Sequence, residues 1–407
     1  MNHVVNKQQL KENKIGIKKV GLIAVFFLFL YPISYNGLSI NYSFIFFPIA
    51  YLLLLGKAVA PPAIIRFYIL VYVSILIVAA SYQLNFLPEI GRRLTSFVLF
   101  MSMFSFVFVK VDKVMIQAFK IALIFISICF SLFSIVSFVA LGGSSLGFEA
   151  KDLIGTQRFG FIYLIAIGIM AIEFKITNLP LLIKLSIISV LLLGLLLTFS
   201  RASLVSLMTG GFIFFLYGVY KWLRSPNIKM LFHTVSIVFL LVVVFALVVN
   251  YVPIVQQFFD ERLFSFFLDS DSVQNNLQNE NSSEGTRLAI QQMILRYVAL
   301  NPITGTGYLG VWNISNGFTG SAHNQFSDTL LRTGFPGFAI YLSMLLMTLK
   351  VLYKTERGLF WGFVCVMFYG LFHETFKESQ GGFVLAFFLG IMSQYPLPLK
   401  NIETREV

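Results

Sequence analysis

The sequence predicts an all-α polytopic membrane protein with about twelve transmembrane helices and one large loop on the side away from the cytoplasm. Of its 407 residues, 57% are hydrophobic and only 12% are charged, a composition that no soluble fold accommodates. A helix needs about 20 mostly apolar residues to cross a hydrocarbon core, and segments of that length recur from one end of the chain to the other. The predicted spans are residues 20–35, 38–56, 64–82, 94–110, 115–141, 159–174, 179–199, 202–220, 231–251, 335–353, 359–374 and 381–395.

Lys and Arg residues orient these spans, because cytoplasmic loops carry an excess of positive charge. If the Lys-rich N-terminus lies inside, twenty of the thirty Lys and Arg residues fall on the cytoplasmic side and ten on the outer side. Both termini are then cytoplasmic, and the net charge of +12 reflects the orientation of the loops and not nucleic-acid binding. The N-terminal segment resembles a signal peptide but has no small-residue cleavage site, so we expect it to remain as the first helix.

The spans divide the chain into three regions. Residues 1–251 are expected to form nine transmembrane helices, residues 252–334 the outer loop, and residues 335–407 three further helices with a cytoplasmic tail. The loop is polar, but its segment 285–300 has an apolar side and is followed by Pro302, which ends a helix. We therefore expect an amphipathic helix there, lying near the membrane surface or over a cavity.

Arginine dominates the outer side. Eight of the ten outer basic residues are Arg, whereas the cytoplasmic side has sixteen Lys and four Arg. A planar guanidinium group binds phosphate oxygens bidentately, so this distribution indicates a phosphate-bearing substrate on the outer side. Each single arginine could instead extend from the membrane interface to water, and that alternative stays open. The outer arginines are Arg92, Arg93, Arg158, Arg201, Arg262, Arg287, Arg296 and Arg332.

Two of these arginines lie on the expected amphipathic helix. Arg287 and Arg296 are nine residues apart, which places them about half a rotation from each other. At most one of them can therefore point into a given site.

His323 is the candidate proton acceptor on the outer side. It follows a stretch rich in Gly, Asn and Ser and directly precedes Asn324. A lone histidine is more often structural than catalytic. The presence of Arg201 and Arg287 on the same outer side favours the catalytic interpretation. An imidazole with a pKa near 6.5 is also the natural proton acceptor near neutral pH.

Two short motifs suggest chemistry that their surroundings exclude. Gly305–Gly310 fits the dinucleotide pattern GxGxxG, but a helix and a proline precede it where the pattern needs a strand. This turn, which includes Gly307 and Tyr308, instead lets the backbone approach a ligand or a helix end. His373-Glu374 begins like the zinc motif HExxH, but Lys377 stands at the fifth position and is a poor zinc ligand. We predict no metal site and expect a polar rim at the outer end of span eleven.

Three segments resemble the O-antigen ligase/polymerase superfamily. The first is Thr198-Phe-Ser-Arg201-Ala-Ser. The second combines Gly285-Thr-Arg287-Leu-Ala with Asn301-Pro-Ile-Thr-Gly-Thr-Gly307, and the third is His323-Asn324 followed by nine residues and Gly334-Phe-Pro-Gly337. The His-Asn-x9-Gly-x-x-Gly spacing is the most specific part. The resemblance covers about residues 190–345 and extends to the twelve-span layout with its large loop.

The resemblance implies a metal-independent glycosyltransferase of the bacterial inner membrane that uses no cofactor. Its donor and acceptor would be glycans on undecaprenyl pyrophosphate, joined in the periplasm, and its protein partners would be a chain-length regulator and a flippase. Arg201 and Arg287 would hold the pyrophosphate, and His323 would activate the acceptor hydroxyl. Further substrate-binding candidates are Asn324, Arg92, Arg93, Arg158, Arg296, Gly307 and Tyr308.

The motifs do not separate the two activities of the superfamily. We favour an O-antigen polymerase, because Arg92, Arg93 and Arg158 could hold a second lipid pyrophosphate and the outer loop is modest in size. The alternative is an O-antigen ligase, which transfers the glycan to lipid A–core. A flippase for the same lipid-linked sugars is disfavoured, because transporters place key charges near the bilayer midplane and these spans are nearly free of charge.

Overall fold

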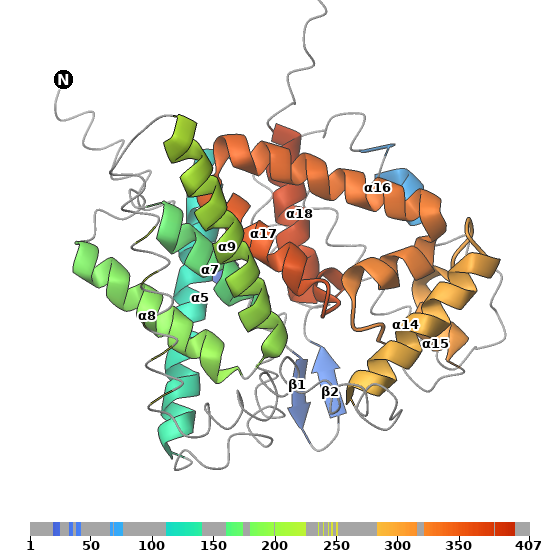
Figure 1. Ribbon diagram of the computed structural model, residues 1–407, viewed down its shortest axis with the longest axis horizontal. Coiled ribbons are helices and arrows are strands. Elements are labelled where there is room, and N and C mark those ends of the chain that lie inside the picture. The colour runs from blue at the N-terminus through green and yellow to red at the C-terminus, as the bar shows by residue number, and fades with distance from the viewer. Residues whose placement is uncertain are drawn as a thin grey trace, which may run out of the picture.

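In the residues that it describes, the computed structural model is helical apart from one short hairpin and short turns (Figure 1). Three of these described helices are long and apolar enough to cross a membrane: Lys113–Val139, Arg201–Arg224 and Gln325–Thr355. Four shorter apolar helices accompany them, so the described part of the chain agrees with a membrane protein. The structure describes residues 19–24, 32–35, 38–41, 66–67, 69–75, 111–140, 160–173, 180–198, 200–224, 235, 239, 243, 246, 250, 283–315, 321–377 and 379–394.

The described helices coincide with the apolar segments of the sequence. The main helices are α5 (Lys113–Ala140), α7 (Gly160–Ile172), α8 (Leu181–Leu197), α9 (Arg201–Arg224), α14 (Ser283–Leu300), α15 (Val311–Ile314), α16 (Gln325–Thr355), α17 (Arg357–Tyr369) and α18 (Ser379–Gln394), with 3-10 turns η4 (Gly307–Leu309) and η5 (Thr375–Lys377). Helices α5, α7, α8 and α18 begin and end within three residues of a predicted span, and α9 extends beyond the end of its span. The expected amphipathic helix is present as α14. Span 94–110 lies outside the described residues.

The hairpin corrects the first two predicted spans. Strand β1 (Pro32–Tyr35) pairs antiparallel with β2 (Leu38–Asn41), with Pro32 opposite Asn41 and Tyr35 opposite Leu38. These residues were expected to be helical in spans 20–35 and 38–56. The physical reason lies in the sequence between the strands, because Asn-Gly is the pair most favourable for a two-residue hairpin connection.

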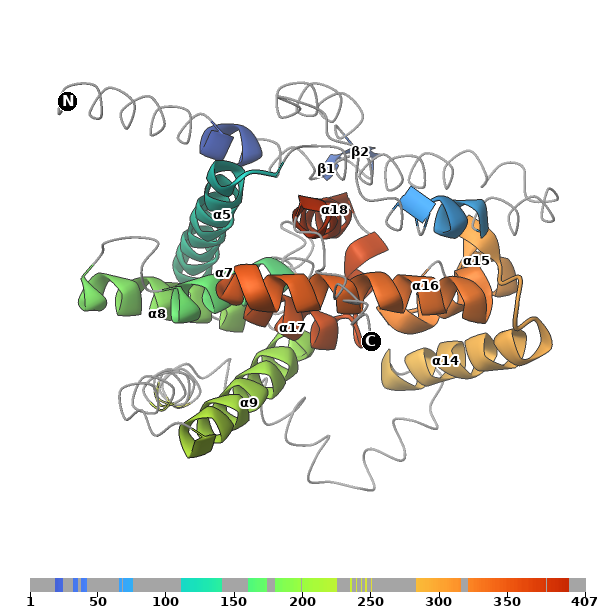
Figure 2. The same ribbon diagram turned by 90° about the horizontal axis from the view of Figure 1, so that it is seen from above.

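Helices α7 and α17 form the centre of the molecule. Figures 1 and 2 show them between α5 and α8 on one side and α16 and α18 on the other. Their close approach depends on glycine, because a Cβ on Gly168 would lie 2.5 Å from the backbone nitrogen of Gly362. Gly358 and Gly362 are four residues apart, the spacing of small residues that brings membrane helices together.

A charged cluster joins the ends of these central helices on the side predicted to be cytoplasmic. The Lys120 ammonium, only 1% exposed, pairs with Glu173 at 2.5 Å and also with Glu356. The backbone N–H of Gly358 donates to Glu173 at 2.9 Å. The cluster therefore links α5, the end of α7 and the junction of α16 with α17.

A second, smaller core seats α14 at the opposite side of the molecule. Ile290, Ile294 and Val298 repeat every four residues along α14 and are buried, as an amphipathic helix requires. They pack with Val311, Ala322 and Leu331, which come from α15, the loop before α16 and α16 itself. This core holds the helix that carries Arg287 against the segment that carries His323.

Candidate functional site

Helix α16 is broken near its beginning, and a glycine makes the break possible. Gly334 has φ 62° and ψ −174°, a backbone conformation that residues with a Cβ rarely adopt. A Cβ at this position would also overlap the carbonyl oxygen of Ile303. The break separates a short first segment of α16 from its long apolar remainder and seats it on the loop that follows α14.

Backbone hydrogen bonds fix that loop against the break. The N–H of Thr306 donates to the Leu331 carbonyl at 2.8 Å, and the N–H of Phe335 donates to the Pro302 carbonyl at 2.8 Å. Gly305 has a positive φ of 65°, and a Cβ there would lie 2.6 Å from the carbonyl carbon of Arg332. The glycine-rich turn therefore approaches a helix end, which is one of the two roles predicted for it.

The guanidinium group of Arg332 is enclosed by this turn. It donates to Asp328 at 2.7 Å through Nε and to the Tyr308 carbonyl through Nη1. A Cβ on Gly310 would overlap the guanidinium, so glycine leaves the space that Arg332 fills. Gly307 is buried in the same turn, and burial raises the pKa of the half-buried Tyr308 phenol, which stays neutral at physiological pH.

His323 lies directly before α16 in an unusual backbone conformation. Its φ is 53°, and among the described residues no other non-glycine residue has a positive φ. Its N–H donates to Ser321 Oγ at 3.2 Å. Asn324 then caps the helix, because its Oδ1 accepts from the N–H groups of Phe326 at 2.9 Å and Ser327 at 3.1 Å. The half-buried imidazole is thus attached to the N-terminus of a helix.

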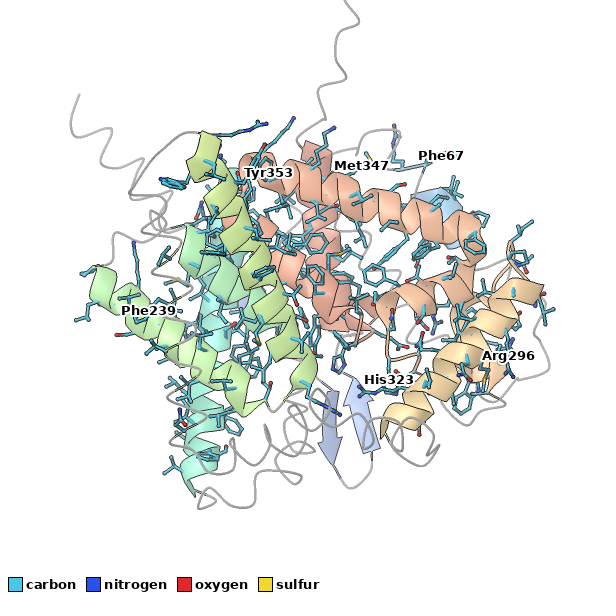
Figure 3. All side chains as sticks on the ribbon, in the orientation of Figure 1. Phe67, Phe239, Arg296, His323, Met347 and Tyr353 are labelled. Carbon is cyan, nitrogen blue, oxygen red and sulfur yellow. The ribbon has the colours of Figure 1, made fainter. Side chains whose placement is uncertain are left out.

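Arg201 and Arg287 lie near the beginnings of two other helices. Arg201 begins α9 after Ser200, whose Oγ accepts from the Ser203 N–H at 3.3 Å, and Arg287 lies in the second turn of α14. Both are half-buried. Figures 1 and 2 show the beginnings of α9 and α14 directed towards each other, and Figure 3 shows His323 on that same side.

Of the other predicted arginines, Arg296 lies in the described part of the chain and does not join this group. Arg296 is exposed on α14, and Figure 3 shows it on the outer side of that helix, well separated from His323. This agrees with the half-rotation that separates it from Arg287. Arg92, Arg93 and Arg158 lie outside the described residues, so their roles stay predictions.

Sequence reasoning missed the residues that support the His323 loop. The Ala322 N–H donates to the carboxylate of Glu374, and the Ala322 carbonyl accepts from Gln291 Nε2 at 2.6 Å. Ala322 and Glu374 are 52 residues apart, and no spacing rule connects them. The available signal was the cluster of polar residues around Glu374 at the end of an apolar span, which we interpreted as an interfacial rim.

Comparison with known proteins finds one family model that matches the segment of the chain that carries these residues. Residues 186–342 match the family model described as O-antigen ligase, a segment that runs from within α8 to within α16. It contains Arg201, Arg287, His323 and the break at Gly334. No curated protein matches the chain. Residues 186–342 are thus similar to the O-antigen ligase family, which supports the resemblance to the O-antigen ligase/polymerase superfamily, and the described residues include helices long and apolar enough to cross a membrane.

Proposed function

We propose that the protein transfers a glycan from undecaprenyl pyrophosphate to an acceptor hydroxyl at the outer face of the bacterial inner membrane. One observation carries the proposal. The helix beginnings that bear Arg201 and Arg287 and the loop that bears His323 lie on one side of the molecule (Figures 1 and 3). Positive groups beside an imidazole are what the transfer requires, because the leaving group is a diphosphate and the nucleophile must lose a proton.

The proposed reaction is a direct displacement at the anomeric carbon. The acceptor oxygen forms the new glycosidic bond while the bond from that carbon to the pyrophosphate oxygen breaks, and the electron pair leaves with the diphosphate. His323 accepts the hydroxyl proton, which typically contributes about 10²–10⁴-fold to the rate. Arg201 and Arg287 stabilise the charge that develops on the departing oxygens. Direct attack inverts the anomeric centre.

The proposed reaction needs no metal ion. A metal would serve to neutralise the diphosphate as it departs, and two guanidinium groups supply the same charge with bidentate hydrogen bonds. Asn324 already caps α16 through its side chain and contributes to the site by fixing His323 beside the helix N-terminus.

Within the superfamily we assign the protein to the O-antigen polymerases. A polymerase binds two lipid pyrophosphates, one on the growing chain and one on the incoming repeat unit. The sequence offers Arg92, Arg93 and Arg158 on the predicted outer side for the second of them. The second candidate is an O-antigen ligase, which is the activity named by the matching family model.

The lipopolysaccharide of a deletion strain separates these two functions. Loss of a polymerase leaves lipopolysaccharide capped with a single repeat unit, whereas loss of a ligase leaves bare core. We expect the single-repeat product, with the long ladder restored by the wild-type gene. Bare core would assign the protein as a ligase, and an unaltered ladder would refute both functions.

A further inference from the structure

We infer that Glu374 is a positioning residue that holds His323 in place to accept the proton from the acceptor hydroxyl. The inference rests on the proposed function, because it assigns His323 the role of base. It concerns a residue that neither the sequence motifs nor the family match singles out.

His323 needs support from outside its own segment. Its φ of 53° lies in the left-handed region, which is unfavourable for a residue with a Cβ and persists only when the surroundings impose it. Its own backbone N–H donates locally, to Ser321 Oγ. The residues on either side of it make bonds that reach across the fold.

The turn after α17, residues 370–377, is hydrogen-bonded to the chain on both sides of His323. Before it, the Ala322 N–H donates to the Glu374 carboxylate. After it, the Gln325 N–H donates to the Gly370 carbonyl at 2.7 Å, and Gln325 Oε1 accepts from the Phe376 N–H at 2.8 Å. His323 therefore occupies the apex of a segment whose two ends are bonded to one turn.

That turn is itself well fixed, so it can impose a conformation. The His373 N–H donates to the Tyr369 carbonyl at 3.1 Å, and the His373 ring stacks on Tyr369 with centroids 4.7 Å apart. Tyr369 is buried in the main core. Glu374 thus fixes the peptide that precedes His323 relative to α17.

The negative charge of Glu374 has a second function in this arrangement. Its carboxylate interacts electrostatically with Arg332, the guanidinium group enclosed by the glycine-rich turn. A glutamate can therefore accept from Ala322 and attract Arg332 at once, whereas a glutamine could do only the first. The His323 loop, the Glu374 turn and the glycine-rich turn are connected through these two side chains.

Gln291 completes the support from the side of α14. Its amide donates to the Ala322 carbonyl at 2.6 Å, so both polar groups around Ala322 are bonded. Gln291 lies four residues after Arg287 and hence on the same side of α14. The bond from Gln291 to Ala322 therefore fixes α14, which carries Arg287, relative to the segment that carries His323.

Steady-state kinetics of the purified full-length protein test this inference. The substrate is an undecaprenyl-pyrophosphate-linked repeat unit, and the variants are Glu374→Ala, Glu374→Gln and Gln291→Leu. We expect Glu374→Ala to lower kcat by up to about 10²-fold with little change in KM, because a displaced base slows the chemical step. Glu374→Gln should retain more activity than Glu374→Ala, since its amide oxygen still accepts from Ala322. Gln292→Leu is the matched control, because Gln292 is exposed beside Gln291, and it should behave as wild type.

The background of His323→Ala distinguishes positioning from a general structural role. If Glu374 acts through His323, Glu374→Ala causes no further loss once the imidazole is absent. A merely structural role would reduce the residual activity of His323→Ala by the same factor as in the wild type. If thermal unfolding shows that Glu374→Ala does not fold, the loss of activity in the two backgrounds is instead compared for Glu374→Gln and Gln291→Leu.

The outcomes separate this inference from the proposed function. An active wild type, a strongly impaired His323→Ala and a Glu374→Ala variant with kcat within about twofold of wild type would overturn the inference alone. Equal losses in both backgrounds would overturn it as well. A wild type that does not elongate the glycan, or a fully active His323→Ala, would instead refute the proposed function.

Discussion

At the scale of the residue, the site combines groups of two kinds. Arg201, Arg287 and His323 are half-buried, and the two helix beginnings and the loop that bear them lie on one side of the molecule. Asp328 and Arg332 are enclosed and bind each other, and Arg332 also binds the glycine-rich turn. The first group is suited to bind and react, and the second fixes the segment that presents His323.

Replacement of His323 by Ala should abolish most of the activity. Removal of a general base typically lowers the rate by about 10²–10⁴-fold, while binding through the arginines is retained. The measurement is the rate of glycan elongation by the purified variant, compared at saturating substrate. A rate equal to that of the wild type would show that another group accepts the proton.

Replacement of Arg201 by Lys should also inactivate the enzyme, although the charge is kept. A guanidinium group offers two parallel donors to a diphosphate, and an ammonium group cannot reproduce that geometry. Arg296→Lys is the matched control, because Arg296 is exposed on the outer side of α14. Polysaccharide of normal length and amount from a well-expressed Arg201→Lys strain would contradict the prediction.

At the scale of the element, the broken helix α16 is the feature that shapes the site. Its first segment presents His323 at the N-terminus, and its second segment is the apolar part of a candidate membrane span. The sequence predicted that span only from residue 335, because Gln325, Ser327 and Asp328 make the preceding residues polar. The helix in fact begins at Gln325, and the predicted boundary coincides with the break at Gly334.

Gly334→Ala tests the importance of the break. The backbone conformation of Gly334 costs a residue with a Cβ about 1–3 kcal/mol, and overlap with the Ile303 carbonyl adds to this. We expect a lower thermal unfolding midpoint and reduced activity. Gly21→Ala is the control, since a Cβ on Gly21 would meet nothing within 4 Å. Equal midpoints for the two variants would show that α16 does not require the break.

Other elements differ in how far the sequence could predict them. Long apolar runs predicted α5, α7, α9, α17 and α18, because burial in hydrocarbon leaves a strong compositional signal. The hairpin at Pro32–Asn41 was hidden by the same signal, since its short strands mix apolar residues with Ser34, Ser39 and Asn41 and are flanked by longer apolar runs. The bond between Ala322 and Glu374 joins segments 52 residues apart, which are separated along the chain by α16 and α17, two helices that contact each other.

At the scale of the whole molecule, polar clusters are found at two opposite ends of the helices. One contains His323 and its supporting residues on the predicted outer side. The other contains Lys120, Glu173 and Glu356 on the predicted cytoplasmic side, where it joins three helices. The core between them is apolar and closely packed through α7 and α17.

Lys120→Met should destabilise the protein without changing the chemistry of the outer site. Removal of one partner from a buried ion pair typically costs about 3–5 kcal/mol, because the remaining charges keep their desolvation penalty. Lys19→Met is the control, since the Lys19–Asp112 pair is longer at 3.6 Å and partly exposed. Thermal unfolding in detergent measures both. A smaller effect for Lys120→Met than for Lys19→Met would contradict the structural role of the cluster.

The central claim is that outer arginines and His323 together transfer a glycan away from a lipid diphosphate. The most direct test incubates the purified protein with undecaprenyl-pyrophosphate-linked repeat units and no energy source. The account predicts longer glycans and free undecaprenyl pyrophosphate from the wild type, and formation of both products about 10²–10⁴-fold more slowly by His323→Ala. Unchanged substrate with the folded wild type, or equal rates from both proteins, would contradict it.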